Sequence, residues 1–158
     1  MNPTDVNGEY VERPTTKRHV LQTTARFHDS LGLLFPVSVV EKLLFQDTWC
    51  RGLAWDEILP SDLGALWKIW VSTLKYIAHL RVRGWVDIVD RSHSQVHVFY
   101  DASERAYGAV LYIRSCTADN LVHLACSKNR LAPVKKVTLP RLELLAALVG
   151  ARMLRYFC

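Results

Sequence analysis

Two acidic residues stand in runs of sequence that predict rigid elements. Asp101 ends an alternating apolar run that begins at Val96, and Glu143 follows Pro140 at the start of an apolar helical run. Carboxylates that are held on separate rigid elements and brought together can bind divalent metal ions. Paired ions activate water and stabilise the leaving oxygen when a phosphodiester is cleaved. We therefore take Asp101 and Glu143 as the candidate catalytic and metal-binding residues.

Each carboxylate alone has an ordinary structural interpretation. An Asp at the end of a strand can close a turn, and a Glu in the first turns of a helix is favoured by the helix dipole. The two residues together favour a metal site only because one ends a predicted strand and the other begins a predicted helix of the same predicted unit.

The positive charge is concentrated at the end of the chain. Residues 126–158 contain seven Lys and Arg residues against Glu143 alone, a net charge of +6, whereas the other 125 residues sum to −1. A basic block suits a polyanion such as nucleic acid, because it neutralises phosphates and releases their counterions. A solvated helix face is the alternative interpretation.

Composition restricts the class of protein. A chain of 158 residues with 50% hydrophobic content can bury one ordinary core, and no apolar run approaches the roughly 20 residues of a membrane span. We expect an intracellular, cytoplasmic protein without a membrane. The cysteines form no C-x-x-C pair and sit in apolar runs, which predicts reduced, buried thiols at Cys50, Cys116, Cys126 and Cys158.

Apolar spacing predicts three helices in the first half of the chain. They cover residues 20–27, residues 38–52 with Ser38 as N-cap, and residues 61–77. Trp67 and Trp70 in the third helix are expected in the core rather than as a platform for stacking bases.

Alternating patterns predict three strands in the second half, over residues 95–101, 107–114 and 121–127. The turn residues 118–120 make the second and third strands antiparallel neighbours. A basic connection over residues 128–140 leads to a helix from Arg141. Gly108 is expected to let a nucleic-acid backbone or a phosphate approach closely.

Three antiparallel strands followed by a helix resemble the opening half of the ribonuclease H fold. The predicted fold class is therefore α/β, a truncated ribonuclease H-like unit preceded by a mainly helical linking segment. We divide the chain into a polar linker or cut end at 1–17, a helical linking segment at 18–84 and the incomplete ribonuclease H-like domain at 93–158.

Two long runs carry a family resemblance. The segments DASERAYGAVLYIRS and SKNRLAPVKKVTLPRLELLAALVGARML resemble polyproteins of BEL/Pao retrotransposons. Upstream, ARFHDSLGLLFPVSVVEKLLFQDTW and LAWDEILPSDLGALWKIW resemble the region that follows reverse transcriptase in those polyproteins. Together the resemblance covers nearly all of the chain from about Lys17.

The resemblance implies a function and a set of residues. Asp101 matches the first metal-binding Asp of ribonuclease H and Glu143 the second acid, while the third and fourth carboxylates would lie beyond Cys158. The parent enzyme would use two Mg²⁺ ions to cut the RNA strand of an RNA·DNA hybrid, and this chain alone is expected to show little or no hydrolysis. The implied partners are nucleic acid and the rest of the Pol polyprotein, including reverse transcriptase, in the cytoplasm or in virus-like particles. The implied contacts with the nucleic acid come from Ser103, Lys128, Arg130 and Arg141.

Two alternatives stay open. One is a non-catalytic nucleic-acid-binding or scaffold relic, in which the carboxylates have lost their role. The other is an aspartic-type retrotransposon peptidase, a description often given to this region. A peptidase of that kind needs D-[S/T]-G so that two carboxylates can approach and share a proton. The candidate triplets at Asp29 and Asp47 lack the Gly, which disfavours this chemistry.

Overall fold

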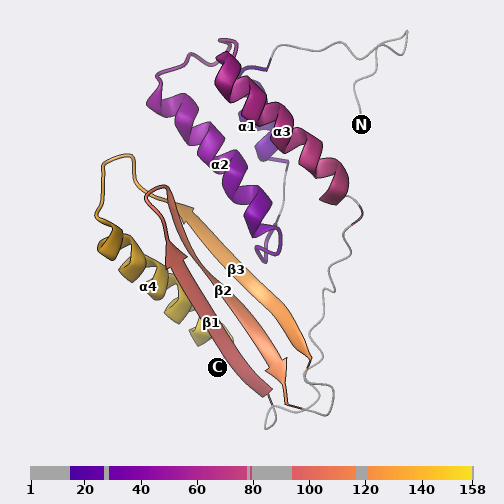
Figure 1. Cartoon of the computed structure of the whole chain (residues 1–158), viewed down its shortest axis with the longest axis vertical. Coiled ribbons are helices and arrows are strands. Elements are labelled where there is room, and N and C mark those ends of the chain that lie inside the picture. The colour runs from indigo at the N-terminus through magenta and orange to yellow at the C-terminus, as the bar shows by residue number, and fades with distance from the viewer. Residues whose placement is uncertain (1–14, 27–28, 78, 80–93, 117–120, 158) are drawn as a thin grey trace.

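Helices precede an antiparallel sheet, and one helix follows it (Figure 1). The computed structural model describes residues 15–26, 29–77, 79, 94–116 and 121–157. This order confirms the predicted α/β class and is consistent with a ribonuclease H-like unit. Three positions named from the sequence lie outside the described residues. They are Phe27 at the predicted end of the first helix, His93 at the predicted start of the ribonuclease H-like domain, and Cys158. The elements are α1 Lys17–Thr24, α2 Phe35–Cys50, α3 Ser61–Ile77, β1 Ser94–Ala102, β2 Ala106–Ser115, β3 Val122–Leu131 and α4 Leu139–Phe157.

The first three helices share one hydrophobic core. Trp67 and Trp70 of α3 are 4% and 3% exposed, and their stacked rings lie 5.0 Å apart between centroids. The indole N–H of Trp70 donates to the carbonyl of Val37 in α2, so burial leaves it paired. The expected burial of both tryptophans is confirmed. Their buried neighbours in this core are Val20, Leu44, Leu59 and Leu63.

The predicted N-cap of α2 is wrong. The helix begins at Phe35, and Ser38 is buried inside its first turn, where its hydroxyl donates to the Phe35 carbonyl. The N-cap residue is Leu34, and it makes no side-chain capping bond. The carboxylate of Asp29 accepts the backbone N–H groups of Leu33 and Leu34, each at 2.9 Å, and so closes the turn that leads into the helix.

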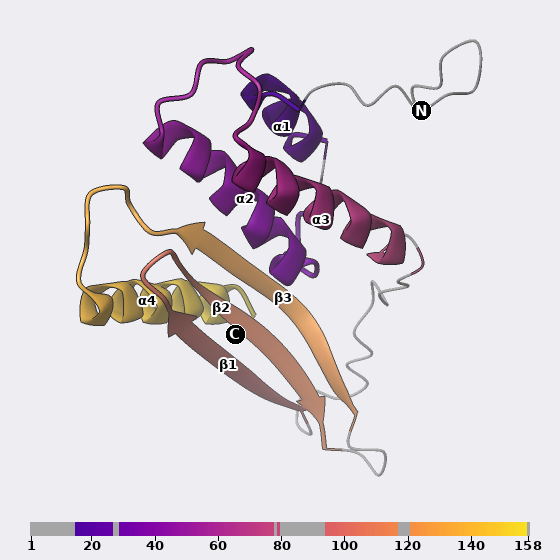
Figure 2. The same cartoon turned by 45° about the horizontal axis from the view of Figure 1, so that its top comes forward.

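The sheet has the order β1-β2-β3 and is antiparallel throughout. Helix α4 covers one face of it, over β1 and β2, whereas α2 lies beside β3 on the other side (Figure 2). Under α4 lies the second core, in which Leu111 is fully buried. The pairing therefore places alternate β2 residues under α4 and the others toward α2. The buried members of this core are Ala109, Leu111, Ile113, Ala125, Val149 and Met153.

Strand β3 is longer than predicted. It continues to Leu131, so residues 128–131 belong to the sheet and not to the basic connection, and α4 begins at Leu139 rather than at Arg141. The sequence Ser-Lys-Asn-Arg is poor in strand-forming residues, but pairing with β2 overrides that preference. The side chain of Asn129 also joins β3 to α2, because its amide accepts from Lys42 at 2.8 Å.

Two further expectations are wrong. A Cβ on Gly108 would lie 2.8 Å from the Lys128 carbonyl oxygen and 3.1 Å from the Phe35 ring, so the protein itself fills the space expected for nucleic acid. Cys50 and Cys116 are exposed and Cys126 is half-buried, because the first two lie at the ends of α2 and β2 rather than inside a core.

Candidate metal and nucleic-acid site

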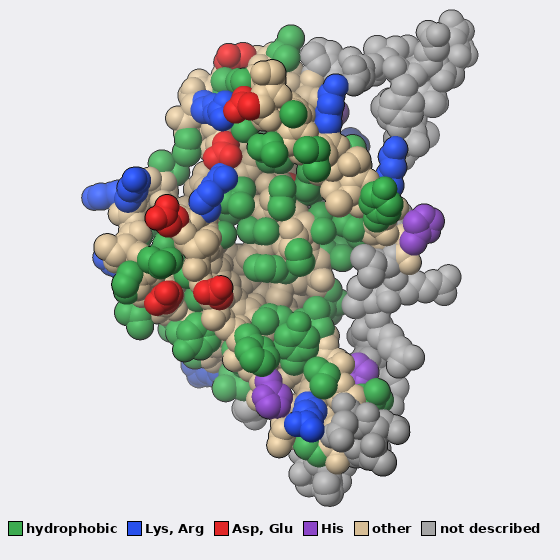
Figure 3. Space-filling view, in the orientation of Figure 1, with side chains coloured by type: hydrophobic (Ala, Val, Ile, Leu, Met, Phe, Trp, Pro, Cys, Tyr) green, Lys and Arg blue, Asp and Glu red, His purple; other side chains and the backbone are tan. Residues whose placement is uncertain are grey.

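Asp101 is exposed near the end of β1, opposite Gly108 of β2. Its Oδ1 accepts the backbone N–H of Ala102 at 2.8 Å, which holds the carboxylate beside the strand. Strand alternation turns Asp101 to the same face as Phe99, away from α4. There both residues border a pocket of about 350 Å³ between the sheet and the start of α2. Hydrophobic side chains gather on this side of the molecule (Figure 3).

Glu143 is exposed on the flank of α4 that faces β1. It shares a helix row with Ala147 and Gly150, and a Cβ on Gly150 would lie 2.9 Å from Val98 of β1. Because α4 begins at the end of the sheet where β1 ends (Figure 1), both acids belong to one corner of the molecule. They approach it from opposite faces of the sheet. The metal-binding role of the pair stays a prediction.

The basic residues predicted to contact nucleic acid lie on the other flank of α4. Lys128 and Arg130 pair in the sheet with Ala109 and Tyr107, residues that belong to the core under α4, so their side chains leave the sheet on the α4 face. Arg141 lies on the flank of α4 toward β3, since it precedes the buried Leu142 by one position. All three basic side chains are exposed.

Sequence reasoning missed Arg152 as a site residue. It follows Arg141 by eleven positions, about three helical turns, so both arginines lie along the same flank of α4. Arg152 is also exposed. The helical spacing was the signal that could have found it. Helix α4 therefore carries Glu143 on one flank and Arg141 and Arg152 on the other.

Ser103 has a clear structural task. Its hydroxyl accepts the backbone N–H groups of Arg105 and Ala106 and donates to the carbonyl of Ala106 at 3.0 Å. These bonds close the turn between β1 and β2. A contact with a substrate strand stays a prediction for this residue.

The two peptidase candidates are both used by the fold. Asp29 closes the turn before α2 by accepting two backbone N–H groups, and Asp47 forms an ion pair with Arg105 at 2.7 Å. Thr48, which follows Asp47, is buried within α2 and its hydroxyl donates to the Phe45 carbonyl. An aspartic peptidase needs two carboxylates that face each other and share a proton. Neither Asp is placed on a free loop that a second carboxylate could meet in that way.

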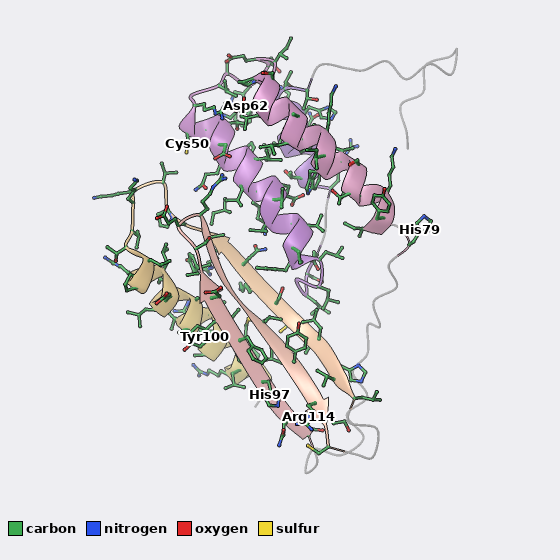
Figure 4. All side chains as sticks on the ribbon, in the orientation of Figure 1. Cys50, Asp62, His79, His97, Tyr100 and Arg114 are labelled. Atoms are coloured by element: carbon green, nitrogen blue, oxygen red, sulfur yellow. The ribbon has the colours of Figure 1, made fainter. Side chains whose placement is uncertain are left out.

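The histidine and cysteine side chains that the structure describes do not form a cluster. Cys50, His79 and His97 lie at separate ends of the molecule (Figure 4). Among the residues that the structure describes, no three of His, Cys, Asp and Glu come together as a group that could hold a metal. In the same part of the chain, no helix combines the length and apolar character that a membrane crossing needs.

The succession of elements agrees with a match to a known family. A sequence model of the Pao retrotransposon-like RNaseH-like domain matches residues 16–158. The chain belongs to this family. No curated protein and no solved structure matches the chain. The match confirms the resemblance to Pao retrotransposons and runs through the helices as well as the sheet of this Pao domain, so it covers both segments of the predicted division at 18–84 and 93–158.

Proposed function

We propose that this Pao domain binds an RNA·DNA hybrid and that Asp101 and Glu143 are the metal-binding carboxylates of its RNA-cleaving site. One observation supports this most: the family match spans the element order in which Asp101 lies near the end of β1 and Glu143 lies in the second turn of α4, at the same end of the sheet. The domain would work within a Pol polyprotein that includes reverse transcriptase.

The donor set suits Mg²⁺. Both carboxylates are exposed, and one oxygen of Asp101 is bonded to Ala102 while its other oxygen has no such bond among the described residues. Mg²⁺ in nucleic-acid enzymes is typically held by one or two carboxylates and completes its octahedron with water and substrate phosphate. Bound there, it would supply activated water and stabilise the leaving oxygen.

The chain's own residues orient the substrate. The acidic and basic flanks of α4 lie on either side of a helix roughly 10 Å wide. A duplex laid across α4 would bring one backbone to Glu143, beside the edge of β1, and the other to Arg141 and Arg152. Phosphate contacts of this kind fix the position of a duplex without reading its sequence.

Hydrolysis by this chain alone is expected to be weak. Only two carboxylates are assigned to the metal ions, and a two-metal site must clamp both the attacking and the leaving oxygen. The same observation favours the second candidate, a nucleic-acid-binding module without catalysis, in which the basic flank retains its role and the acids do not.

Mg²⁺ titration followed by NMR at Asp101 and Glu143 tests the metal site. We expect both carboxylates to respond, and Asp101→Asn or Glu143→Gln to abolish the response. Glu104→Gln is the matched control, because it removes an exposed acid from the turn that follows β1. A response that survives both site variants would refute the assignment.

Hybrid binding without metal tests the basic flank. Arg141→Ala and Arg152→Ala should each lower the slope of log affinity against log salt by about 1. The same mixtures, supplied with Mg²⁺, report cleavage. If the protein binds the hybrid without cleaving it, and Asp101→Asn leaves that binding unchanged, the domain is a non-catalytic binding module. If the salt slope is unchanged in Arg141→Ala and Arg152→Ala, the basic flank does not bind the hybrid.

A further inference from the structure

A groove runs between α2 and the connection from β3 to α4. One part of it, of about 450 Å³, is almost wholly apolar and is bordered by Phe45 and Trp49 of α2 and by Leu131 and Val134 of the connection and the strand before it. The second part, of about 500 Å³, is more polar. The two parts lie next to each other, because Gln46 and Val134 border both.

The polar part of the groove reaches the corner that holds the two acids. It is bordered by Glu104 and Arg105 in the turn that follows β1 and by Leu139, the first residue of α4. Asp101 closely precedes that turn, and Glu143 lies about one helical turn beyond Leu139. A nucleic-acid strand that passes the acids can therefore continue into the groove.

Three contacts hold the two walls of the groove in place. The side-chain amide of Gln46 donates to the Ala132 carbonyl at 2.8 Å, and Asp47 of α2 forms its ion pair with Arg105. The backbone N–H of Ala132 donates to the Arg105 carbonyl at 2.9 Å, which joins the connection to the turn after β1. The groove thus exists before anything binds, and a preformed groove lowers the cost of ordering on binding.

Trp49 provides an exposed aromatic surface on the apolar wall. Its side chain is 52% exposed, and Val134 on the opposite wall is 69% exposed. The Trp49 ring is held in position, since the ammonium of Lys17 lies 3.5 Å from its centroid and the Trp55 ring packs edge to face with it. Rigid aromatic side chains in a groove are the surfaces on which single-stranded nucleic acids place their bases.

Positive charge accompanies this apolar wall. Lys42 borders the apolar part of the groove and Lys136 the polar part, and the exposed Lys135 lies beside them in the connection. Of the two acids on the walls, Asp47 is paired with Arg105, which leaves Glu104. Lysines that neutralise phosphates beside an apolar wall for bases suit a single strand of nucleic acid better than an apolar protein segment.

We propose that the groove binds the single-stranded continuation of the RNA strand beyond the hybrid. The bases would lie in the apolar part against Trp49 and Val134, and the phosphates near Lys42 and Lys136. The choice of RNA rests on the proposed function, in which the strand that passes Asp101 and Glu143 is the RNA. The linking helices would then hold substrate together with the ribonuclease H-like unit.

A hybrid with a single-stranded RNA extension tests the groove. Its affinity is compared with that of a blunt hybrid, without metal so that nothing is cleaved, and separate substrates carry about four extra nucleotides at the 5′ or the 3′ end. At one of the two ends the RNA extension should tighten binding about five- to thirtyfold. Unchanged affinity at both ends would refute the groove, and a DNA extension that tightens binding equally would refute the choice of RNA.

Charge changes at Val134 locate the contact. Val134 lies on the exposed connection, so its substitution leaves both cores intact. Val134→Lys should tighten and Val134→Glu should weaken binding of the extended hybrid, each roughly two- to fivefold. The same changes at Val122, which is 59% exposed at the other end of β3, are the matched controls and should leave the gain from the extension unchanged. Equal weakening by Lys and Glu at Val134 would indicate a purely apolar contact and would overturn the proposal.

The groove and the RNA-cleaving site can fail separately. If the RNA extension tightens binding but Mg²⁺ brings no cleavage that depends on Asp101, the groove is supported and the RNA-cleaving site is refuted. If Asp101→Asn abolishes cleavage of the blunt hybrid but the extension adds no affinity, the RNA-cleaving site is supported and the groove is refuted.

Discussion

Replacing Glu41 by Gln should stabilise the protein in a pH-dependent way. Glu41 lies in α2 and is 3% exposed, and its Oε2 is buried without a hydrogen-bond partner. It borders a polar pocket of about 280 Å³ at the junction with β3, which also contains Asp29 and Lys42. Burial raises the pKa of Glu41 from 4.5 to about 7, although the positive charge of Lys42 opposes the rise.

The direction and the size of the stability change follow from this pKa. A carboxyl whose pKa is raised in the folded state contributes stability that is fully present below pH 4.5 and is lost as pH rises to about 7. The full loss is about 3 kcal/mol for a shift of this size. Gln keeps the shape but does not ionise, and its buried N–H groups cost about 1 kcal/mol where they stay unpaired. That cost is the same at every pH, so the advantage of the variant should grow by about 2.5 kcal/mol between pH 5 and pH 8.

Urea unfolding of both proteins at the two pH values measures this difference. Comparison with the parent protein removes the pH dependence of the other groups, and Glu104→Gln is the control at an exposed acid. A stability difference between Glu41→Gln and the parent that is the same at pH 5 and pH 8 would refute the burial of an ionisable Glu41.

Three substitutions test the backbone conformation and the packing of the helices and the sheet. Gly32→Ala should cost about 3 kcal/mol in the free energy of unfolding, because Gly32 has φ +70° and a Cβ there would collide with the Ser127 carbonyl. Gly52→Ala, at φ +67° with open space around it, should cost only about 1 kcal/mol and separates strain from collision. Trp70→Phe should cost about 2 kcal/mol through the lost bond to Val37 and the smaller ring, measured as a lower urea midpoint.

Local patterns predicted the parts of the fold that local forces decide. The three-and-four spacing of α3 gave its start at Ser61 and its buried tryptophans, because an amphipathic helix needs only one apolar face to be specified. The alternating run before Asp101 likewise gave β1 and the place of its carboxylate. The family match supports the same element order.

Contacts between distant residues decided what the sequence patterns missed. Ser38 has the right type for an N-cap, but the chain reverses at Gly32, in a turn that Asp29 closes, and the helix already begins at Phe35. Residues 128–131 have weak strand preference, but β2 pairs with them and Asn129 bonds to α2. Neither outcome is encoded within a window of a few residues, so periodicity alone could not find it.

The candidate site shows the same division between local and distant forces. Sequence placed Asp101 at a strand end and Glu143 at a helix start, yet their relation depends on how α4 packs across β1. Gly150 sets that relation, because the absence of a side chain lets α4 lie against Val98 and turns the row of Glu143 toward the edge strand. Asp101 reaches the same edge from the opposite face. The relation between the two acids is therefore set by the packing of α4 across the sheet, which no local pattern in the sequence encodes.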